Sequence, residues 1–317
     1  RYRSPASESG TRTAGDARHA DQVTVIINFV IPRRKIMFFD NNRLLSAAFA
    51  VMCFAASPFL RADQDELLNV AEELNSEAEV IEDDDFQAVL RTRAAELYRT
   101  YASQTGGDKA ASALLKACNQ YVKIGGNEAL SHALVCTMLV AEKHGSSKLA
   151  PDSLVLRGEI YFQKKEWGRA VKTWIACADK HQQADAAPRA LFRAGQVLQK
   201  NIKNPAEAEK QYARVIATYP NSEVADDSLF NRAGVLTDGD KFEDAIADYL
   251  SLTKLFPSGE LADKAMYEAA VLCDEELKDY KRAYNLAVEF RQAFPHSALL
   301  RKMERIEAKT LRYVKDS

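Results

Sequence analysis

The sequence predicts an all-α fold, a right-handed superhelical solenoid made of helix pairs. Its C-terminal half repeats about every 37–38 residues. The clearest copies begin at Tyr219-Pro220 and Phe256-Pro257, and a weaker copy begins at Phe294-Pro295. Between these prolines, apolar residues recur at helical spacing. A fixed period of this length predicts stacked units, none of which can bury its apolar face alone.

The first predicted helix of each unit contains a small residue, with a large apolar residue four positions before it. The small residues are Gly158, Gly195, Gly234 and Ala270, and the apolar residues are Leu154, Leu191, Phe230 and Met266. This i, i+4 spacing marks one buried helix face. Glycine within a helix costs about 1 kcal/mol relative to alanine, so its recurrence predicts that the second helix crosses close to the backbone there.

The second predicted helix of each unit carries an alanine and, in three units, an aromatic residue four positions later. The alanines are Ala170, Ala208, Ala245 and Ala283, and the aromatic residues are Trp174, Tyr212 and Tyr249. Three units then reach a proline, namely Pro220, Pro257 and Pro295. Proline cannot continue a helix and disfavours helical angles in the residue before it, so each proline predicts a turn into the next unit.

These positions resemble the tetratricopeptide repeat, whose helix pairs carry a large and a small residue and then alanine, an aromatic residue and proline. Four units match over residues 151–297, although the first has Gln182 where proline is expected. The phrase aromatic-Pro-x-Ser/Gly-x-x-Ala-Asp is similar to two bacterial envelope proteins. One is the periplasmic partner of the Tol–Pal system, which coordinates cell division, and the other is the helical-repeat lipoprotein of the outer-membrane β-barrel assembly machine. The resemblance implies that residues 151–300 bind other proteins or peptides.

The first 36 residues are unlike the rest of the chain, because they are rich in Ser, Thr, Gly, Ala and Arg. We interpret residues 1–36 as upstream sequence that is not native to the protein. The alternative is a long leader in which Arg33-Arg34 forms a twin-arginine signal.

Residues 37–62 have the layout of a secretory signal peptide. Met37 opens a short polar region, an apolar stretch follows at 44–59, and Ala62 offers a cleavage site, with Ala55 as an alternative. The stretch is shorter than the ~20 residues of a membrane span. We therefore expect export to the periplasm. Lipid anchoring at Cys53 is disfavoured because the large Met52 precedes it.

Residues 63–150 predict further helices that form degenerate repeats. Apolar residues follow helical spacing in 67–81 and 86–102, and Gly125-Gly126 splits two more predicted helices at 109–124 and 128–143. The acidic run at 82–85 is expected to cap the helix that begins at Phe86, where negative charge suits the helix dipole. Residues 301–317 are expected to form a C-terminal capping helix.

Composition limits the kinds of partner. The chain has a net charge of −2, and residues 63–317 contain 34 basic and 41 acidic residues, a net charge of −7. An acidic chain lacks the basic footprint that binding to a nucleic-acid backbone requires. No other stretch approaches the ~20 apolar residues of a membrane span, so none is expected in the mature chain.

Four cysteines follow the predicted signal peptide, at Cys118, Cys136, Cys177 and Cys273. In an oxidising compartment Cys118 and Cys136 could pair, because they flank Gly125-Gly126 at similar distances. The alternative is that each thiol packs as a small apolar group. No spacing of Cys and His suits zinc, so we expect no metal.

The sequence contains no motif that predicts catalysis. It has no HExxH zinc site, no glycine-rich phosphate loop and no GxSxG serine elbow. We therefore expect no catalytic residue, no cofactor and no enzymatic activity.

Ten residues of the first helices are predicted to line an inner groove. In the resembled repeats the first helices face inward, so residues six before, three before and one after each small residue are expected there. The predicted set is Asp152, Val155, Glu159, Arg189, Phe192, Gln196, Ser228, Asn231, Lys264 and Tyr267, to which the same rule adds Val235 and Val271. Phe192 and Tyr267 are the expected anchors for a bound peptide. The alternative is a groove that is solvated or covered by the N-terminal helices.

We therefore expect an exported, non-enzymatic protein-binding scaffold of the bacterial cell envelope. By resemblance, it would organise envelope assembly or division machinery. Two alternatives stay open. One is an accessory subunit of outer-membrane protein assembly, which would need membrane tethering. The other is an enzyme, or a regulator of a peptidoglycan enzyme, with its site in residues 63–150. The sequence leaves the partner and the oligomeric state undetermined.

Overall fold

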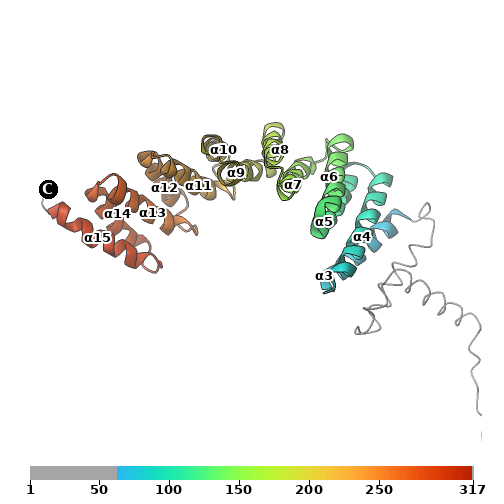
Figure 1. Cartoon of the computed structure of the whole chain (residues 1–317), viewed down its shortest axis with the longest axis horizontal. Helices are drawn as coiled ribbons and strands as arrows, with labels where there is room; N and C mark the ends of the chain where they lie inside the picture. Colours follow the sequence, from blue (N-terminus) through green and yellow to red (C-terminus); the bar gives the residue numbers. More distant parts are fainter. Residues whose placement is uncertain (1–62, 316–317) are drawn as a thin grey trace, which may run out of the picture. The chain divides into compact units, whose positions relative to one another are not determined.

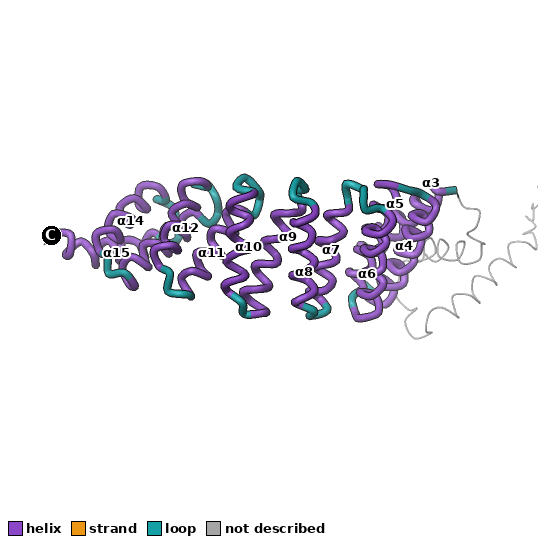
Figure 2. Tube along the Cα trace, turned by 90° about the horizontal axis from the view of Figure 1, so that it is seen from above, coloured by secondary structure: helices purple, strands orange, loops and turns teal. Residues whose placement is uncertain are grey.

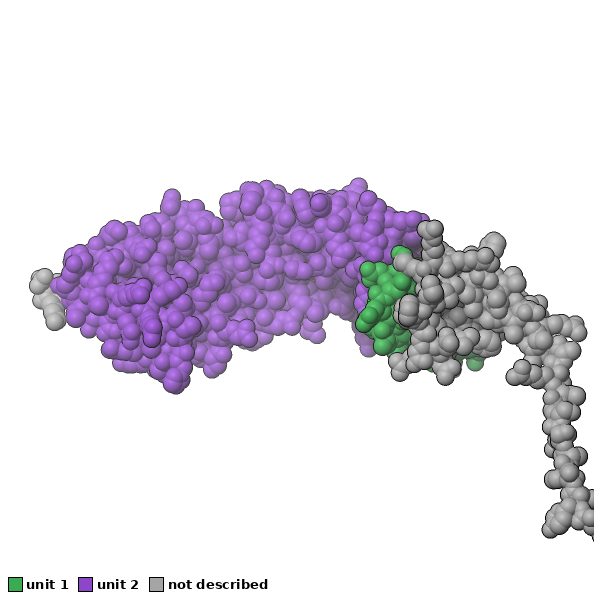
Figure 3. Space-filling model, turned by 60° about the horizontal axis from the view of Figure 1, so that its bottom comes forward, with its two compact units in different colours: residues 1–105 green, residues 106–317 purple. Residues whose placement is uncertain are grey.

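The computed structural model describes residues 63–315 of the 317-residue chain. The expectations for residues 1–36 and 37–62 fall outside the described residues and stay predictions. Over the described range the chain forms helices and turns without a strand, which confirms the all-α solenoid. The chain divides after Thr105 into two compact units, shown in different colours in Figure 3. This division lies inside the predicted N-terminal region 63–150. Residues 106–150 of that region therefore belong to the same compact unit as the repeats.

The first unit is an antiparallel helix pair in its described part. Helices α3 (Gln64–Val80) and α4 (Asp84–Gln104) match the two predicted helices closely. The Asp83 carboxylate accepts a hydrogen bond from the backbone N–H of Phe86 at 3.0 Å, which confirms that the acidic run caps α4. The side chain of Gln64 donates to the carbonyl of Gln104 at 2.9 Å and links the open ends of the pair.

The second unit is a row of eleven α-helices that lie across its length, with their turns along the two edges (Figure 2). The helices are α5 (Gly107–Ile124), α6 (Gly126–Lys143), α7 (Ala150–Gln163), α8 (Trp167–Lys180), α9 (Ala186–Val197), α10 (Pro205–Thr218), α11 (Ala225–Asp238), α12 (Phe242–Leu255), α13 (Ala262–Val271), α14 (Tyr280–Ala293) and α15 (Leu300–Lys315). Odd numbers are first helices and even numbers second helices. Among the described helices, none is both long and apolar enough to cross a membrane.

The first helices lie on the inner side of this row. Each helix packs on its neighbours in sequence, but α7 also approaches α5 and α9, and α9 approaches α11. Successive second helices stay further apart, with α8 and α10 on the outer side in Figure 1. Closer approach on one side means that the row curves toward the first helices, as the resemblance to the tetratricopeptide repeat implied.

Two of the predicted close crossings are confirmed. A Cβ atom added to Gly158 would lie 2.2 Å from Nε1 of Trp174, and one added to Gly195 would lie 2.6 Å from Cε1 of Tyr212. Both rings are buried, with exposed fractions of 1% and 0%. The Trp174 indole N–H donates to the carbonyl of Val155 at 3.0 Å, so the polar atom of this buried ring is satisfied.

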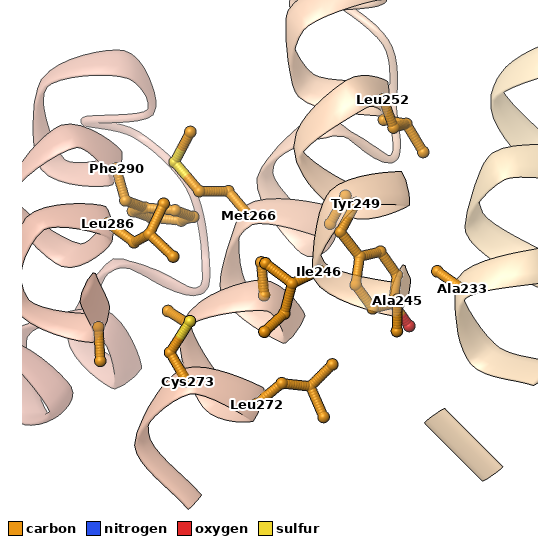
Figure 4. Packing of buried hydrophobic residues seen from close by; sticks show 14 of the residues in the cluster. Ala233, Ala245, Ile246, Tyr249, Leu252, Met266, Leu272, Cys273, Leu286 and Phe290 are labelled. Atoms are coloured by element: carbon orange, nitrogen blue, oxygen red, sulfur yellow. The ribbon is translucent and has the colours of Figure 1, made fainter. Parts of the chain in front are cut away.

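The third predicted crossing was placed one residue too late. A Cβ atom on Gly234 would meet nothing within 4 Å, whereas Ala233 is fully buried. Figure 4 shows Ala233 on α11 pointing toward Ala245 and Tyr249 on α12. Ala233 is therefore the true counterpart of Gly195. With this correction the small residues are 37, 38 and 37 positions apart in place of 37, 39 and 36.

An extra residue in every second pair explains the alternation between 37 and 38. Segments of π-helix, η2 (Leu198–Ile202) and η3 (Leu272–Glu276), extend α9 and α13, but α7 and α11 have none. A π turn accommodates one residue more than the α-helix it interrupts. The chain consequently repeats best over 75 residues, as Asp152-Ser153-Leu154 and Asp227-Ser228-Leu229 illustrate.

The turns that join successive pairs share one hydrogen-bond pattern. The carbonyl at the start of the turn accepts from the N–H three residues on, and that residue's carbonyl accepts from the N–H three further on. The pattern starts at His144, His181, Tyr219, Phe256 and Phe294. The turn at His181 forms without proline, so Gln182 does not interrupt the repeat. The turn at His144 shows that the same geometry precedes the first repeat predicted from the sequence.

A serine–aspartate hydrogen bond ties some of these turns to the start of the preceding first helix. Ser297 donates to Asp263 at 2.6 Å, and Ser147 donates to Asp108 at 2.6 Å. The corresponding Ser222 hydroxyl is buried without a partner, because Pro188 occupies the position of the aspartate. Among the copies of the sequence motif, Ser297 and Asp263 therefore form one contact between neighbouring units, and Ser147 and Asp108 form the same contact earlier in the chain.

Alanine substitutions at Gly195 and Gly234 should change the free energy of unfolding in opposite directions. Gly195→Ala forces a contact with the Tyr212 ring, so we expect a loss of about 1–3 kcal/mol in the free energy of unfolding. Gly234→Ala meets open space and removes a helix glycine, so we expect a gain of about 1 kcal/mol. Urea denaturation followed by circular dichroism measures both changes. A loss of similar size in both variants would contradict the placement of the second helices.

The serine contacts allow a second paired comparison. Ser297→Ala removes a hydrogen bond to a carboxylate, and we expect a loss of about 1.5–3 kcal/mol. Ser222→Ala removes a buried hydroxyl that has no partner, and stability should stay unchanged or rise. Pro188→Asp restores the missing carboxylate, so it should stabilise the chain only when Ser222 is present. Thermal unfolding of these variants and of Pro188→Asp with Ser222→Ala tests the coupling. Equal effects of Pro188→Asp in both backgrounds would rule out the inferred contact.

Candidate functional site

A cleft of about 270 Å³ opens between the first helices α7 and α9. It is lined by Asp152, Val155, Leu156 and Glu159 of α7 and by Arg189 and Arg193 of α9. Four of these six were predicted groove residues: Asp152, Val155, Glu159 and Arg189. The sequence rule missed Leu156 and Arg193, which both lie two residues before a small residue on the same helix face. The structure thus brings four of the six residues predicted for the first two repeats into one cleft, and leaves Phe192 and Gln196 out of its lining.

One arginine of the cleft is firmly held. Nε and Nη2 of Arg193 donate to the two carboxylate oxygens of Glu159 at 2.8 and 3.1 Å. Its remaining Nη1 donates to the side chain of Gln196 at 3.3 Å, which places this predicted residue beside the cleft. A two-point contact between planar groups fixes the geometry of both. Arg193 and Glu159 therefore form a rigid polar wall.

The other arginine is loosely held. Nη2 of Arg189 lies 3.6 Å from Asp152, and its Nε lies 3.5 Å from Glu223. Both separations exceed the usual 2.7–2.9 Å of a charge-assisted hydrogen bond. The Arg189 side chain is 46% exposed. This cation can therefore reorient toward an added carboxylate or phosphate without breaking a strong internal contact.

The groove residues predicted for the third repeat were also placed one residue too late, like the small residue Gly234. The structure places Ser228 in the core, where it is 0% exposed and donates to the carbonyl of Val224, and Val235 is buried too. Asn231 is half-buried and donates to the carbonyl of Asp227. Asp227 and Phe230, the residues that precede Ser228 and Asn231, are the true counterparts of Arg189 and Phe192. The repeated triplet Asp-Ser-Leu was the sequence signal that could have fixed this register.

The two predicted aromatic anchors differ. Phe192 is only 8% exposed, and its ring lies 6.0 Å from that of Tyr212, so it belongs mainly to the core. Tyr267 is half-buried, and the Nζ atom of Lys302 lies 5.5 Å from its ring centre. The Nζ atom of Lys264 likewise lies 4.6 Å from the centre of the Phe230 ring. An ammonium group over an aromatic face is weakly attractive, so these lysines shield rings of the inner surface.

Burial alters the ionisation of several groups near these helices. The pKa of Asp227 is raised by burial and by the neighbouring carboxylates of Asp226 and Glu260. Burial also raises the pKa of the thiols of Cys177 and Cys273 to about 11. The four described cysteines, including Cys118 and Cys136, are buried, and none of them forms a disulfide bond. No group of three or more His, Cys, Asp or Glu residues between 63 and 315 is placed to hold a metal ion.

A different arginine, Arg232, forms a largely buried ion pair outside the cleft. Arg232 on α11 donates through Nε to Asp248 on α12 at 2.6 Å and forms a second short contact through Nη2. Asp248 is only 6% exposed. The hydrogen bond that Arg232 donates to Asp248 is the main reason that the pKa of Arg232 is raised. This ion pair joins the two helices of one repeat and is not part of the cleft.

Replacing Arg232 or Arg189 with alanine should distinguish an arginine that stabilises the fold from one that is available to a partner. Arg232→Ala strands a buried carboxylate, so we expect a loss of about 3–5 kcal/mol in the free energy of unfolding. Arg189→Ala breaks only long, exposed ion pairs, so we expect a change below about 1 kcal/mol. Denaturant titration of the two variants gives the comparison. Strong destabilisation by Arg189→Ala would show that the cleft arginine is structural.

Comparisons with known proteins agree with the repeat architecture. A family model described as "Tetratricopeptide repeat" matches residues 189–222, which cover most of α9, all of α10 and part of the following turn. The sequence matches none of the curated proteins with which it was compared.

Solved structures with similar helical repeats include YrrB, described as a TPR protein with an unusual peptide-binding site, at 16% identity and a TM-score of 0.44 over 67% of this chain and 99% of that one. PilF of Pseudomonas aeruginosa has 14% identity and a TM-score of 0.43, over 76% and 98% of the two chains. The C-terminal part of a TPR repeat-containing protein from Cytophaga hutchinsonii has 14% identity and a TM-score of 0.44, over 81% and 98%. The family match alone identifies residues 189–222 as a tetratricopeptide repeat, and the cleft lies at the first helix of this segment.

Proposed function

We propose that the chain is a non-enzymatic scaffold that binds an extended segment of a partner protein along its first helices. The observation that carries this proposal is the cleft between α7 and α9, with a loosely held cation at its edge. The tetratricopeptide repeat at residues 189–222 supports it, because such repeats serve as protein-binding modules and this one begins at Arg189.

The lining of the cleft indicates what kind of segment it would hold. Val155 and Leu156 supply an apolar surface, while Asp152 and Glu159 supply carboxylate acceptors. Arg189 can form a two-point contact with a carboxylate. We therefore propose that the partner segment places an acidic side chain, or a terminal carboxylate, next to an apolar side chain. Carboxylates of the cleft would then accept hydrogen bonds from the backbone N–H groups of the segment.

We further propose that this binding takes place in the bacterial cell envelope, after export through residues 37–62. The layout of Met37, the apolar stretch at 44–59 and Ala62 supports export. The sequence phrase at the repeat turns supports a role in organising envelope assembly or division, by its resemblance to envelope proteins. Periplasmic location is testable by cell fractionation of the tagged chain, with and without residues 37–62.

The binding proposal is tested by crosslinking in intact cells of the source organism. Arg189→Glu reverses the loosely held cation, and we expect one captured envelope protein to be lost or reduced at least tenfold. Lys172→Glu is the matched control, since it reverses an exposed charge on the second helix α8. Phe192→Ala is unsuitable, because it would open the core. Equal capture by all three chains, at unchanged helicity, would exclude the cleft as the binding site.

A further inference from the structure

The charges of the chain are concentrated in two separate places. Residues 63–105 contain twelve acidic and three basic residues, a net charge of −9, while residues 300–315 contain six basic and two acidic residues, a net charge of +4. The intervening residues 106–299 are almost neutral at −1. This distribution does not follow from the repeat pattern and has no role in the cleft.

Three of the six basic residues of α15 lie on one exposed face of the helix, whereas Lys309 pairs with Asp274 and Lys302 covers the Tyr267 ring. Arg301, Arg305, Ala308 and Arg312 follow helical spacing, and all four are exposed. The opposite face packs through Met303, Ile306 and Thr310 on the preceding helices. Neither Arg301 nor Arg305 has an acidic partner among the described residues. The cationic face, defined by Arg301, Arg305 and Arg312, is therefore open to solvent.

The negative charge of the first unit is arranged in a matching way. Glu66, Asn69 and Glu73 form one exposed stripe of α3, with the same spacing as Arg305, Ala308 and Arg312 on α15. Charges seven residues apart lie about 10.5 Å apart along a helix axis. Two carboxylates on one stripe can thus face two guanidinium groups on the other. Neutral Asn69 and small Ala308 lie between them and permit close approach.

We propose that the cationic face of α15 docks on the acidic stripe of α3 in a second copy of this chain, so that the protein associates head to tail. This contact goes beyond the proposed function, because it uses neither the cleft nor its partner. Each copy would keep one cationic face and one acidic stripe available. Heterologous contacts of this kind form rings when their rotation closes and filaments when it does not.

Electrostatic origin predicts a strong salt dependence. Exposed charges are screened over about 8–10 Å at physiological ionic strength. We expect sedimentation velocity of the full chain to show species larger than the monomer at low salt and mainly monomer at high salt. A monomer at every protein concentration in low salt would overturn the proposal.

Charge reversal identifies the two surfaces. Arg301→Glu/Arg305→Glu/Arg312→Glu makes α15 acidic, and Glu66→Lys/Glu73→Lys makes the α3 stripe basic. Each variant alone should remain monomeric at low salt, because its two surfaces now carry the same sign. A mixture of the two variants should associate again, because each reversed surface meets the unlike surface of the other variant. Lys172→Glu/Lys180→Glu on α8 is the control and should associate like the wild type.

Two outcomes would contradict the proposed contact. If the α15 variant still associates like the wild type, another surface is responsible. If each variant is monomeric but their mixture is too, the two stripes do not face each other. The cationic face would then fit a different anionic partner, which binding to vesicles containing phosphatidylserine would reveal. Circular dichroism of every variant excludes unfolding as the cause.

Discussion

The approach of each second helix to the backbone of the first controls this fold. In two repeats a buried aromatic ring occupies the space that a side chain at Gly158 or Gly195 would fill. Burying a large aromatic side chain stabilises a protein by about 1.5–3 kcal/mol, whereas a glycine inside a helix costs only about 1 kcal/mol. The exchange is favourable, so the small residue and the ring occur together. Every pair then presents its remaining apolar surface to the next pair.

The same crossing sets which residues reach the inner surface. Once a second helix fixes the rotation of the first, residues at constant offsets from the small residue point away from the core. This is why Asp152, Arg189, Asp227 and Lys264 occupy equivalent positions on four successive first helices. Their signs alternate because the chain repeats best over two pairs. Arg189 and Lys264 occupy equivalent positions, but Arg189 is loosely held at the cleft whereas Lys264 covers the Phe230 ring.

Much of this structure was predictable from the sequence, because both helix faces and turn residues carry local signals. Helical spacing gave the helices, and the small residues gave two of the crossings. The third crossing was misplaced because Ala233 and Gly234 are adjacent and glycine looks like the stronger signal, although the core selected the residue that faces Tyr249. The π segments could not be predicted, since an added residue inside a helix leaves the apolar pattern almost intact. Four of the ten groove residues line one cleft, while Ser228 and most of Phe192 are buried.

The contacts between neighbouring units are not the same along the row of helices, and the turn that contains Ser222 lacks one of them. One buried cluster extends from Ala170 to Val224 and includes Val235 of α11, while a second begins at Leu229 on the same helix and ends at Ile306, so the two cores meet across α11. At the turn before α11, the Ser222 hydroxyl has no carboxylate partner, unlike the hydroxyls of Ser147 and Ser297. Repeat proteins open at their weakest interfaces, in cooperative blocks. We therefore expect two blocks that meet at α11 to exchange amide hydrogens separately, and the segment matched as a tetratricopeptide repeat belongs to the first of them.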